Sequence, residues 1–331
     1  MNLFLNILLL LVGFVALIKG ADFFVDGSAS IARTLKVPGV IIGLTIVAMG
    51  TSAPELAVSA SAAFNKSNEI AISNVTGSNI FNLLMVLGVC AIIRPIPIDR
   101  GIVKRDFPLS IAVTVAVLAT AGINIFTGMY NPFDTKFTQN VGELSRWFGI
   151  GLLVVFVAYL VFLILLARKN RTDEPEEKPM PVWKALIFIV LGAAAIVLGG
   201  NLVVNNAKDI AKFFGMSETL IGLTIVALGT SLPELVTSIV ASRKGENGMA
   251  VGNVVGSNIF NLMLILGVSA TINPITVNYA AVVDLAILLF VSVVTLVFSL
   301  TKKISRAEGA IMVALYFGTM AFAIVRDMVW S

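Results

Sequence analysis

The chain has 331 residues, of which 58% are hydrophobic and only 13% carry a charge, and its net charge is +4. A soluble domain carries about 25% charged residues, so this chain lacks the polar surface that a water-soluble fold of its size requires. The composition therefore excludes a cytosolic enzyme, a nucleic-acid-binding protein and a disordered chain, and it indicates an integral membrane protein with several spans.

Missing residue types narrow the chemistry further. The chain has no histidine, which excludes His-ligated zinc, haem and Ser-His catalysis within it. The single cysteine, Cys90, excludes an intrachain disulfide and a cysteine cluster. No Gly-x-x-x-x-Gly-Lys-Ser/Thr loop occurs, so we expect no ATP binding by that device. We also expect no cofactor and no obligatory protein partner.

Several stretches are apolar and long enough to cross a bilayer, for which a helix needs about 20 residues. In chain order they are residues 3–19, 37–63, 70–93, 107–127, 148–167, 183–204, 217–241, 249–272, 280–300 and 308–326. The first stretch lacks a preceding basic segment and a small-x-small cleavage site, so we expect a mature helix rather than a signal peptide. The sequence thus predicts an all-α polytopic membrane protein with ten transmembrane helices.

Basic residues are distributed unevenly over the loops between these spans. When the loops are assigned alternately to the two sides, 17 of the 23 Lys and Arg fall on one side and 6 on the other. Loops rich in Lys and Arg stay in the cytoplasm. We therefore expect a multi-pass protein of the plasma membrane with both termini outside. The polar linker 168–181 should be cytoplasmic, and the polar segment 128–147 should form an outer loop.

The most informative feature is an internal repeat. GLTIVAMGTSAPEL at 43–56 recurs as GLTIVALGTSLPEL at 222–235, and NVTGSNIFNL at 74–83 recurs as NVVGSNIFNL at 253–262. Both matches have an offset of 179, and 32 of the 54 positions in 43–96 are identical without a gap. A duplication retained for packing would explain apolar similarity. It does not explain why the polar segments are the most alike.

The repeat also predicts the architecture. Five spans separate equivalent helices, and an odd number reverses the direction across the bilayer, so the two repeats should be inverted. We predict a first five-helix repeat at 1–167, with its motif region at 43–96, and a second at 182–331, with its motif region at 222–275. Inverted repeats are typical of secondary transporters, whose substrate site lies near the midplane between the repeats.

Gly50-Thr51-Ser52-Ala53-Pro54-Glu55 lies within a long apolar run. Proline and glycine should break the helix here, and likewise in the seventh span. A break at membrane depth is tolerated only where it is buried in protein or lines a wet cavity. Glu55 would then cost about 2.5–3.5 kcal/mol near the bilayer centre, a cost that a cation would offset. Alternatively, Ser52 and Glu55 form a capping box, a role that can coexist with ion binding.

Residues at spacing i, i+3, i+4 and i+7 share one helix face. On this face the first motif offers a carboxylate, two hydroxyls and, if the helix unwinds there, a freed backbone carbonyl. These groups belong to Glu55, Thr51, Ser52 and Ala48. The second motif repeats the set with Ala227, Thr230, Ser231 and Glu234. Ca²⁺ takes 6–8 oxygen ligands at about 2.3–2.6 Å, and two glutamates balance its charge.

The second repeated motif is rich in amides. Asn74, Ser78 and Asn82 are four residues apart and share a helix face, which Asn253, Ser257 and Asn261 repeat. Small and amide side chains also join transmembrane helices, so packing is the alternative role. Beside the glutamate motif we favour Ser78, Asn82, Ser257 and Asn261 as ligands. Asn79 and Asn258 lie off this face, and their role stays open. Gly77 and Gly256 should permit close approach to the broken helix.

The remaining singular residues indicate no site. Asp22 and Asp26 fall at the end of the first span, and their equivalents in the second repeat are asparagines. Asp284, near the start of the ninth span, has an arginine as its equivalent. We expect all three aspartates at the membrane interface, and we expect Cys90 to be a packed apolar residue.

With two Gly-Thr-Ser-x-Pro-Glu-Leu motifs and two Gly-Ser-Asn-Ile-Phe-Asn motifs, the chain resembles the Ca²⁺/cation antiporters, and most closely their Na⁺/Ca²⁺ exchanger branch. The resemblance implies that Glu55 and Glu234 bind Ca²⁺ and Na⁺ alternately, with the neighbouring Thr, Ser and Asn completing the sites. It also implies that the first and sixth helices slide across a static core. Some members carry aspartate where this chain has Asn261, and potassium-dependent members carry further aspartates, so the amides argue against potassium dependence.

The predicted function is therefore exchange of Na⁺ for Ca²⁺ by alternating access, without ATP. Two bare carboxylates in a poorly solvated centre should prefer protons or a metal, and moving them across the bilayer without an ion is costly. Ca²⁺/H⁺ exchange on the same glutamates is the open alternative. A channel and an intramembrane enzyme are weaker ones, since an inverted repeat favours alternating access and the chain offers no nucleophile with a base.

Overall fold

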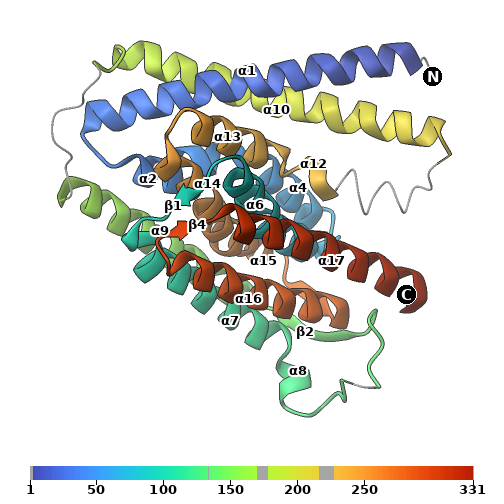
Figure 1. Cartoon of the computed structure of the whole chain (residues 1–331). Helices are drawn as coiled ribbons and strands as arrows, with labels where there is room; N and C mark the ends of the chain where they lie inside the picture. Colours follow the sequence, from blue (N-terminus) through green and yellow to red (C-terminus); the bar gives the residue numbers. More distant parts are fainter. Residues whose placement is uncertain (1–2, 133, 170–177, 216–226, 331) are drawn as a thin grey trace. The chain divides into compact units, whose positions relative to one another are not determined.

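The computed structural model describes residues 3–132, 134–169, 178–215 and 227–330, and most of it is helical (Figure 1). In the first half of the sequence the helices are α1 (Leu3–Leu35), α2 (Gly39–Ile42), the π-helical turn η1 (Gly43–Val47), α3 (Ala48–Thr51), α4 (Ala53–Phe64), α5 (Asn68–Phe81), η2 (Asn82–Val86), α6 (Leu87–Ile93), η3 (Ile102–Asp106), α7 (Phe107–Ala121), α8 (Ile123–Phe126) and α9 (Arg146–Lys169). In the second half they are α10 (Val182–Phe213), α12 (Ala227–Gly229), α13 (Leu232–Arg243), α14 (Asn247–Phe260), η5 (Asn261–Ile265), α15 (Leu266–Ile272), α16 (Tyr279–Ser299) and α17 (Arg306–Trp330).

Seven helical segments of the described residues are long and apolar enough to cross a membrane alone, and a bent pair makes an eighth candidate. The pair joins Gly39–Thr51 to Ala53–Phe64 at 50°, which confirms the break predicted in the second span. Residues 217–226 of the predicted seventh span, and most of the linker 168–181, lie outside the described residues. In its described part the seventh span is interrupted at Thr230 and Ser231, between α12 and α13. The number of ten spans stays a prediction.

Helices α1 and α10 are longer than hydropathy predicts. The sequence ends the first and sixth spans at residues 19 and 204, but α1 continues to Leu35 and α10 to Phe213. The expectation that Asp22 and Asp26 end the first span is therefore wrong, because both lie within α1. Nζ of Lys244 lies 3.3 Å from Oδ1 of Asp22 and 2.7 Å from Oδ1 of Asp26. Hydropathy does not register these ion pairs, which give the polar turns of α1 a partner.

Within the described residues, four short strands form two antiparallel sheets, which the prediction of an all-α fold did not include. β1 (Ile96–Pro97) pairs with β4 (Lys303–Ile304), and β2 (Asn140–Leu144) pairs with β3 (Ile275–Asn278). The sheets join segments between helices, where backbone groups need hydrogen-bond partners. β2 occupies part of the predicted outer loop 128–147. Segments of two to five residues between long apolar runs carry too little pattern to predict such pairing.

The chain divides into two compact units that differ from the two predicted repeats. Unit 1 comprises Met1–Pro54 and Leu163–Ser257, and unit 2 comprises Glu55–Phe162 and Asn258–Ser331. Each unit thus contains elements from both halves of the sequence. Two of the passages between units lie inside the repeated motifs. The division into repeats is a statement about sequence duplication, and it stays a prediction.

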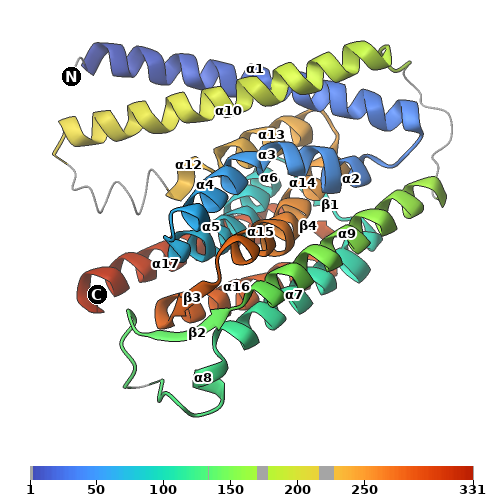
Figure 2. The ribbon, with the colours of Figure 1, turned by 180° about the vertical axis from the view of Figure 1, so that it is seen from behind.

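In unit 1, α1 and α10 lie side by side (Figures 1 and 2). Small residues meet every seven positions along this contact, in the pairs Gly13–Gly199, Gly20–Gly192 and Gly27–Ala185. A Cβ on Gly192 would lie 2.6 Å from the backbone N of Phe24, so the approach requires glycine there. Close contacts between small residues are a common basis of helix association in lipid. The offset of 179 exchanges the first two pairs, which indicates a local two-fold relation between the helices.

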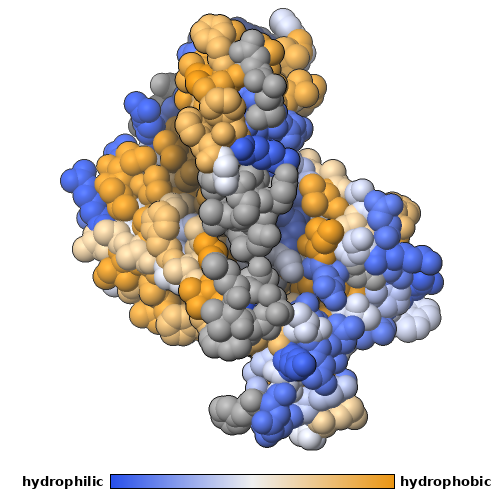
Figure 3. Space-filling view, turned by 90° about the vertical axis from the view of Figure 1, so that its right-hand side faces the viewer, coloured by the Kyte–Doolittle hydropathy of each residue, from blue (hydrophilic) through white to orange (hydrophobic). Residues whose placement is uncertain are grey.

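The outward face of this helix pair is apolar. Val15 of α1 is 62% exposed, and Val190 and Leu198 of α10 are each 64% exposed. Figure 3 shows apolar side chains gathered over the ends of this helix pair. A continuous apolar surface of this kind suits contact with acyl chains rather than with water.

Unit 2 also uses close helix contacts. A Cβ on Gly309 of α17 would lie 2.7 Å from the carbonyl O of Gly88 in α6. The rings of Phe81 and Tyr316 pack edge to face with centroids 5.4 Å apart. These contacts fix α17 against the helix that follows the second repeated motif.

Asp284 and Cys90 lie in unit 2. Asp284 accepts two hydrogen bonds from the guanidinium of Arg326, one of them at 3.0 Å from Nη2 to Oδ2. Cys90 is buried, and its equivalent in the second motif region, Ser269, is buried too. Both positions hold a small side chain that packs, as we expect for Cys90.

Candidate functional site

The break in the second span sets the position of the first glutamate. Ser52 ends α3 with φ −85° and ψ 7°, and α4 begins at Ala53. Pro54 sits in the first turn of α4, where a backbone N–H has no partner within the helix. Glu55 follows in the same turn and is fully buried. A helix N-terminus favours a negative charge, which suits a carboxylate at this position.

The helix does not unwind at Ala48, so its backbone carbonyl is not freed in that way. The carbonyl O of Ala48 accepts hydrogen bonds from the N of Ser52 at 3.0 Å and from Oγ1 of Thr51 at 3.4 Å. Pro54 removes the bond that its own N–H would donate to residue 50, so the helix stays intact up to Thr51. A carbonyl oxygen has a second lone pair, and Ala48 therefore stays a candidate ligand. The equivalent Ala227 begins α12, and its surroundings lie outside the described part of the chain.

Unit 1 holds the second glutamate. Glu234 lies in the first turn of α13 and is fully buried. Oγ of Ser52 donates a hydrogen bond of 2.8 Å to its Oε1. Oε2 has no hydrogen-bond partner among the described residues. Leaving a buried carboxylate oxygen without a donor is costly, and a cation at Oε2 would offset that cost.

Unit 1 contains further hydroxyl groups from the two repeated motifs. Oγ1 of Thr51 donates to Oδ1 of Asn253 at 3.0 Å. In the described part of the chain, Oγ1 of Thr230 and Oγ of Ser257 are buried without a hydrogen-bond partner. Ser231 precedes α13 as its N-cap residue. The capping box that the sequence offers at Ser52 and Glu55 stays an alternative.

Asn74 holds the backbone of the first glutamate in unit 2. Its Nδ2 donates to Oγ of Ser59 at 2.9 Å and to the carbonyl O of Glu55 at 3.4 Å. An amide nitrogen that bridges two turns of α4 positions the helix without adding charge.

The same pair of bonds recurs in unit 1. Nδ2 of Asn253 donates to Oγ of Ser238 at 2.9 Å and to the carbonyl O of Glu234 at 3.5 Å. The sequence places Asn74 and Asn253 on the faces of their neighbouring serines but does not reveal that they position the glutamate helices. The available signal was that Ser59 and Ser238 also match at the offset of 179.

Asn79 and Asn258, whose role the sequence leaves open, bind each other within unit 2. Nδ2 of Asn79 donates to the carbonyl O of Asn258 at 3.3 Å, and Nδ2 of Asn258 donates to the carbonyl O of Asn79 at 3.2 Å. Nδ2 of Asn261 donates to Oδ1 of Asn79 at 3.0 Å. Asn79 and Asn258 therefore join α5 to α14, which is the packing role.

The predicted ligands of unit 2 retain free polar atoms. Oγ of Ser78, both polar atoms of the Asn82 side chain and Oδ1 of Asn261 are buried without a hydrogen-bond partner among the described residues. In native structures most such atoms have a partner. Ser78, Asn82 and Asn261 thus have polar atoms available for a further ligand, which is the role that the sequence predicts for them.

One prediction about glycine is confirmed and its counterpart is not. A Cβ on Gly256 would lie 2.8 Å from both the Cβ of Ala48 and the Cα of Leu44, so this helix approaches the broken one closely in unit 1. Around Gly77, no atom of the described residues comes within 4 Å of such a Cβ.

The predicted ligands are divided between the two units. Unit 1 contains Ala48, Thr51, Ser52, Ala227, Thr230, Ser231, Glu234 and Ser257, and unit 2 contains Glu55, Ser78, Asn82 and Asn261. The atoms that these residues could offer to a cation are carboxylate, hydroxyl, carbonyl and amide oxygens, which favour hard cations such as Ca²⁺. Over the described ranges, no group of three or more His, Cys, Asp or Glu is placed to hold a metal. A cation bound here would thus rely largely on neutral oxygens.

Comparisons with known proteins place these features in a family. Residues 5–165 and 184–325 match the family model described as sodium/calcium exchanger protein. Sodium/calcium exchanger MaX1 of Methanosarcina acetivorans is 34% identical over 345 residues, covering 97% of this chain and 98% of the relative. CaxA of Alkalimonas amylolytica is 40% identical over 321 residues, covering 93% and 95%. A solved structure of the sodium-calcium exchanger NCX_Mj has a TM-score of 0.80 and 32% identity, covering 97% of this chain and 99% of that chain.

Proposed function

This chain belongs to the sodium/calcium exchanger protein family, and on that premise we propose that it exchanges Na⁺ for Ca²⁺ across the cytoplasmic membrane as a secondary active antiporter. Its relatives are exchangers, which confirms the sequence prediction of a transporter rather than an enzyme. Na⁺ and Ca²⁺ are then substrates, and transport needs no cofactor.

The observation that carries the proposal is the buried carboxylate of Glu234, whose Oε2 has no hydrogen-bond partner among the described residues. Glu55 is equally buried and matches Glu234 at the offset of 179. In the proposed site both carboxylates bind the same ion, and their two charges balance one Ca²⁺. The hydroxyl, carbonyl and amide oxygens predicted from the sequence complete the coordination.

Exchange follows from the electrostatics of this site. Two ionised carboxylates without a cation are strongly disfavoured in a medium of low dielectric. The protein should therefore not change the side to which the site opens while the site is empty. A site filled by Ca²⁺ or by Na⁺ lacks that penalty. Inward movement of Na⁺ can therefore drive Ca²⁺ export without ATP. In the proposed architecture, two inverted five-helix repeats give alternating access around the site.

Transport in reconstituted vesicles tests the function. Vesicles that contain the purified chain and are loaded with Na⁺ should take up radioactive Ca²⁺ when diluted into Na⁺-free buffer at the same pH. Vesicles loaded with K⁺ should not. Uptake that follows a pH gradient and ignores the Na⁺ gradient would overturn Na⁺ coupling and support the Ca²⁺/H⁺ alternative.

The proposed orientation can be tested separately. In a Cys90→Ser background, Thr172→Cys in the linker should react with a membrane-impermeant thiol reagent only when the cytoplasmic side is exposed. Asn131→Cys, in the predicted outer loop, should react in intact cells. The reverse pattern would refute the assignment of sides that rests on the distribution of Lys and Arg.

A further inference from the structure

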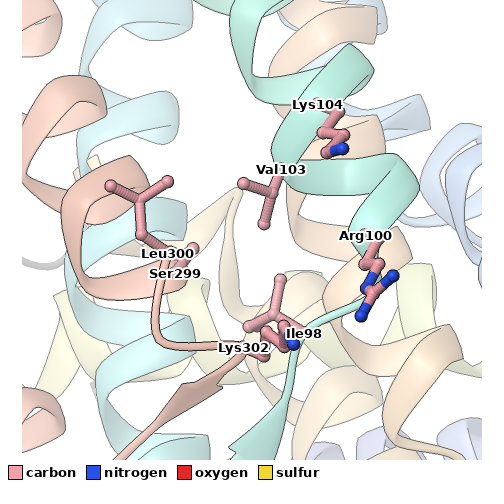
Figure 4. A pocket seen from close by; sticks show the side chains of 7 residues that line it. All are labelled: Ile98, Arg100, Val103, Lys104, Ser299, Leu300 and Lys302. Carbon is pink, nitrogen blue, oxygen red and sulfur yellow. The ribbon is translucent and has the colours of Figure 1, made fainter.

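A cavity at one end of unit 2 carries a cluster of basic side chains that ion transport does not use. It has a volume of about 260 Å³ and lies between the start of the η3–α7 helix and the loop that joins α16 to β4 (Figure 4). Arg100, Lys104 and Lys302 contribute to its lining. All three side chains are exposed, and none forms an ion pair within the described residues.

The walls between these cations are apolar. Ile98, Val103 and Leu300 line the cavity, and Figure 4 shows them around its centre, with the basic side chains at its margin. Leu300 is 60% exposed at the end of α16. An exposed apolar side chain at the end of a membrane span suits contact with lipid. The cavity therefore combines an anion-binding margin with a wall that suits a hydrocarbon chain.

The backbone fixes the position of the third cation. The N of Ile98 donates to the carbonyl O of Lys302 at 2.9 Å, and the β1–β4 pair continues this contact. Lys302 has φ +63°, a left-handed conformation that non-glycine residues rarely adopt. Arg100 and Lys104 lie four residues apart and so project from one helix face. The three charges thus come from two rigid segments held together by a strand pair.

Nearby carboxylates do not neutralise the cluster. Oδ1 of Asp99 accepts a hydrogen bond of 2.6 Å from the N of Gly101 at the start of the helix. Asp106 is fully buried and accepts hydrogen bonds from Arg105 and from the hydroxyl of Tyr159. Arg105 balances the charge of Asp106, and Asp99 offsets at most one of the three cations, so the cavity keeps a net positive charge.

The location indicates which anion fits. α6, α7, α16 and α17 all begin or end at this place in unit 2, so the cavity lies where apolar spans give way to polar loops. The loops concerned belong to the side that carries 17 of the 23 Lys and Arg. Basic pockets between transmembrane helices on the cytoplasmic side suit anionic lipid headgroups.

We propose that this cavity binds the phosphate headgroup of an anionic phospholipid, with Arg100, Lys104 and Lys302 around the phosphate and the acyl chain along Leu300. Pockets for whole drug-sized ligands measure about 300–1,000 Å³, so the present cavity suits a headgroup rather than an entire lipid. A free phosphate would use the cations but not the apolar wall.

Binding of a fluorescent phosphatidylglycerol to the detergent-purified full chain, followed by fluorescence anisotropy, tests the proposal. Each basic side chain near an anionic lipid contributes about fivefold in affinity. The variant Arg100→Gln/Lys104→Gln/Lys302→Gln should therefore bind about 100-fold more weakly, and Lys302→Gln alone about fivefold more weakly. Unlabelled phosphatidylglycerol should displace the probe, whereas phosphatidylcholine should not.

A matched variant controls for general attraction to charge. Arg94→Gln/Lys303→Gln/Arg306→Gln removes three exposed charges from the same loops but not from the cavity lining, and it should change the affinity less than threefold. Equal weakening in both triple variants would overturn the site. Displacement of the probe by inorganic phosphate as readily as by phosphatidylglycerol would overturn the lipid as its ligand. Elution of each variant as a single peak in size-exclusion chromatography confirms that it is folded.

Discussion

Replacement of Glu234 by glutamine tests the proposed site most directly, because it removes one charge and little else. The carboxylate is fully buried, and its Oε1 accepts the hydroxyl of Ser52 at 2.8 Å. The amide oxygen of glutamine can accept the same hydrogen bond and has the same size. Glu234→Gln should therefore leave the fold intact while the proposed site keeps only the charge of Glu55.

The burial of both side chains gives the expected magnitude. Breaking a buried ion pair by removing one partner costs about 3–5 kcal/mol. Since about 1.4 kcal/mol corresponds to a factor of ten, Ca²⁺ affinity should fall by about 10² to 4 × 10³. In the absence of ions the variant should be at least as stable as the original chain, because an uncompensated buried carboxylate is itself destabilising.

Thermal unfolding of the purified chain measures both effects. Ca²⁺ at about 100 times its Kd stabilises a protein by about 2.7 kcal/mol. With an unfolding entropy of about 2.1 cal/mol/K per residue, about 1 kcal/mol shifts the Tm of a chain of 331 residues by roughly 1.4 °C. Ca²⁺ should thus raise the Tm of the original chain by about 4 °C and leave that of Glu234→Gln almost unchanged. Glu69→Gln is the matched control, since Glu69 is an exposed glutamate at the start of α5. A folded Glu234→Gln variant whose Ca²⁺ response equals that of the control would refute the site.

Three further outcomes follow from the same geometry. Ser52→Ala removes a hydrogen bond to a carboxylate, which is worth about 1.5–3 kcal/mol, so the same Ca²⁺ titration should show at least tenfold weaker binding; unchanged affinity would contradict the role of Ser52. Gly192→Leu should lower stability in detergent by about 1–3 kcal/mol or more through overpacking against α1. Gly151→Leu should not, because no atom of the described residues lies within 4 Å of a Cβ there. With two carboxylates the Ca²⁺-loaded site is neutral, so Ca²⁺–Ca²⁺ self-exchange in vesicles should be insensitive to membrane potential; a charged loaded site would respond by about 2.3 kcal/mol per 100 mV.

Hydropathy and turn chemistry predict much of the architecture. Long apolar runs mark the positions of the helices, and the Gly50 to Pro54 segment marks the 50° bend of the second span. The same signals fail at the ends of α1 and α10. There the helices continue through polar turns whose partners, such as Lys244 for Asp22, come from distant positions in the sequence. Contacts of that kind carry no local pattern.

For the candidate site, the sequence predicts the residue types but not their connections. Repetition of Glu55 and Glu234 in an apolar chain identifies both carboxylates as exceptional, and both are buried. The sequence does not show that Asn74 and Asn253 position the glutamate helices, because an amide on a helix face can bond equally well to the backbone, to a serine or to an ion. Whether the helix unwinds at Ala48 could not be predicted for a related reason. Glycine and proline in the sequence show that a helix is disrupted but not which hydrogen bond is lost.

Reciprocal contacts show how the two halves of the sequence combine. Duplication alone requires only that the two halves have similar residues. In unit 1, Gly13 contacts Gly199 and Gly20 contacts Gly192. Because Gly192 is the equivalent of Gly13, and Gly199 that of Gly20, the two contacts are related by exchange of the halves. The two helices come from opposite halves of the sequence, and so do Ser52 and the carboxylate of Glu234 that it binds. Because the bond that orients this carboxylate crosses between the halves, neither half alone can hold it in place. Any movement of α3 relative to α13 must therefore alter the bond to Glu234, which gives the unit a direct way to couple helix position to ion binding.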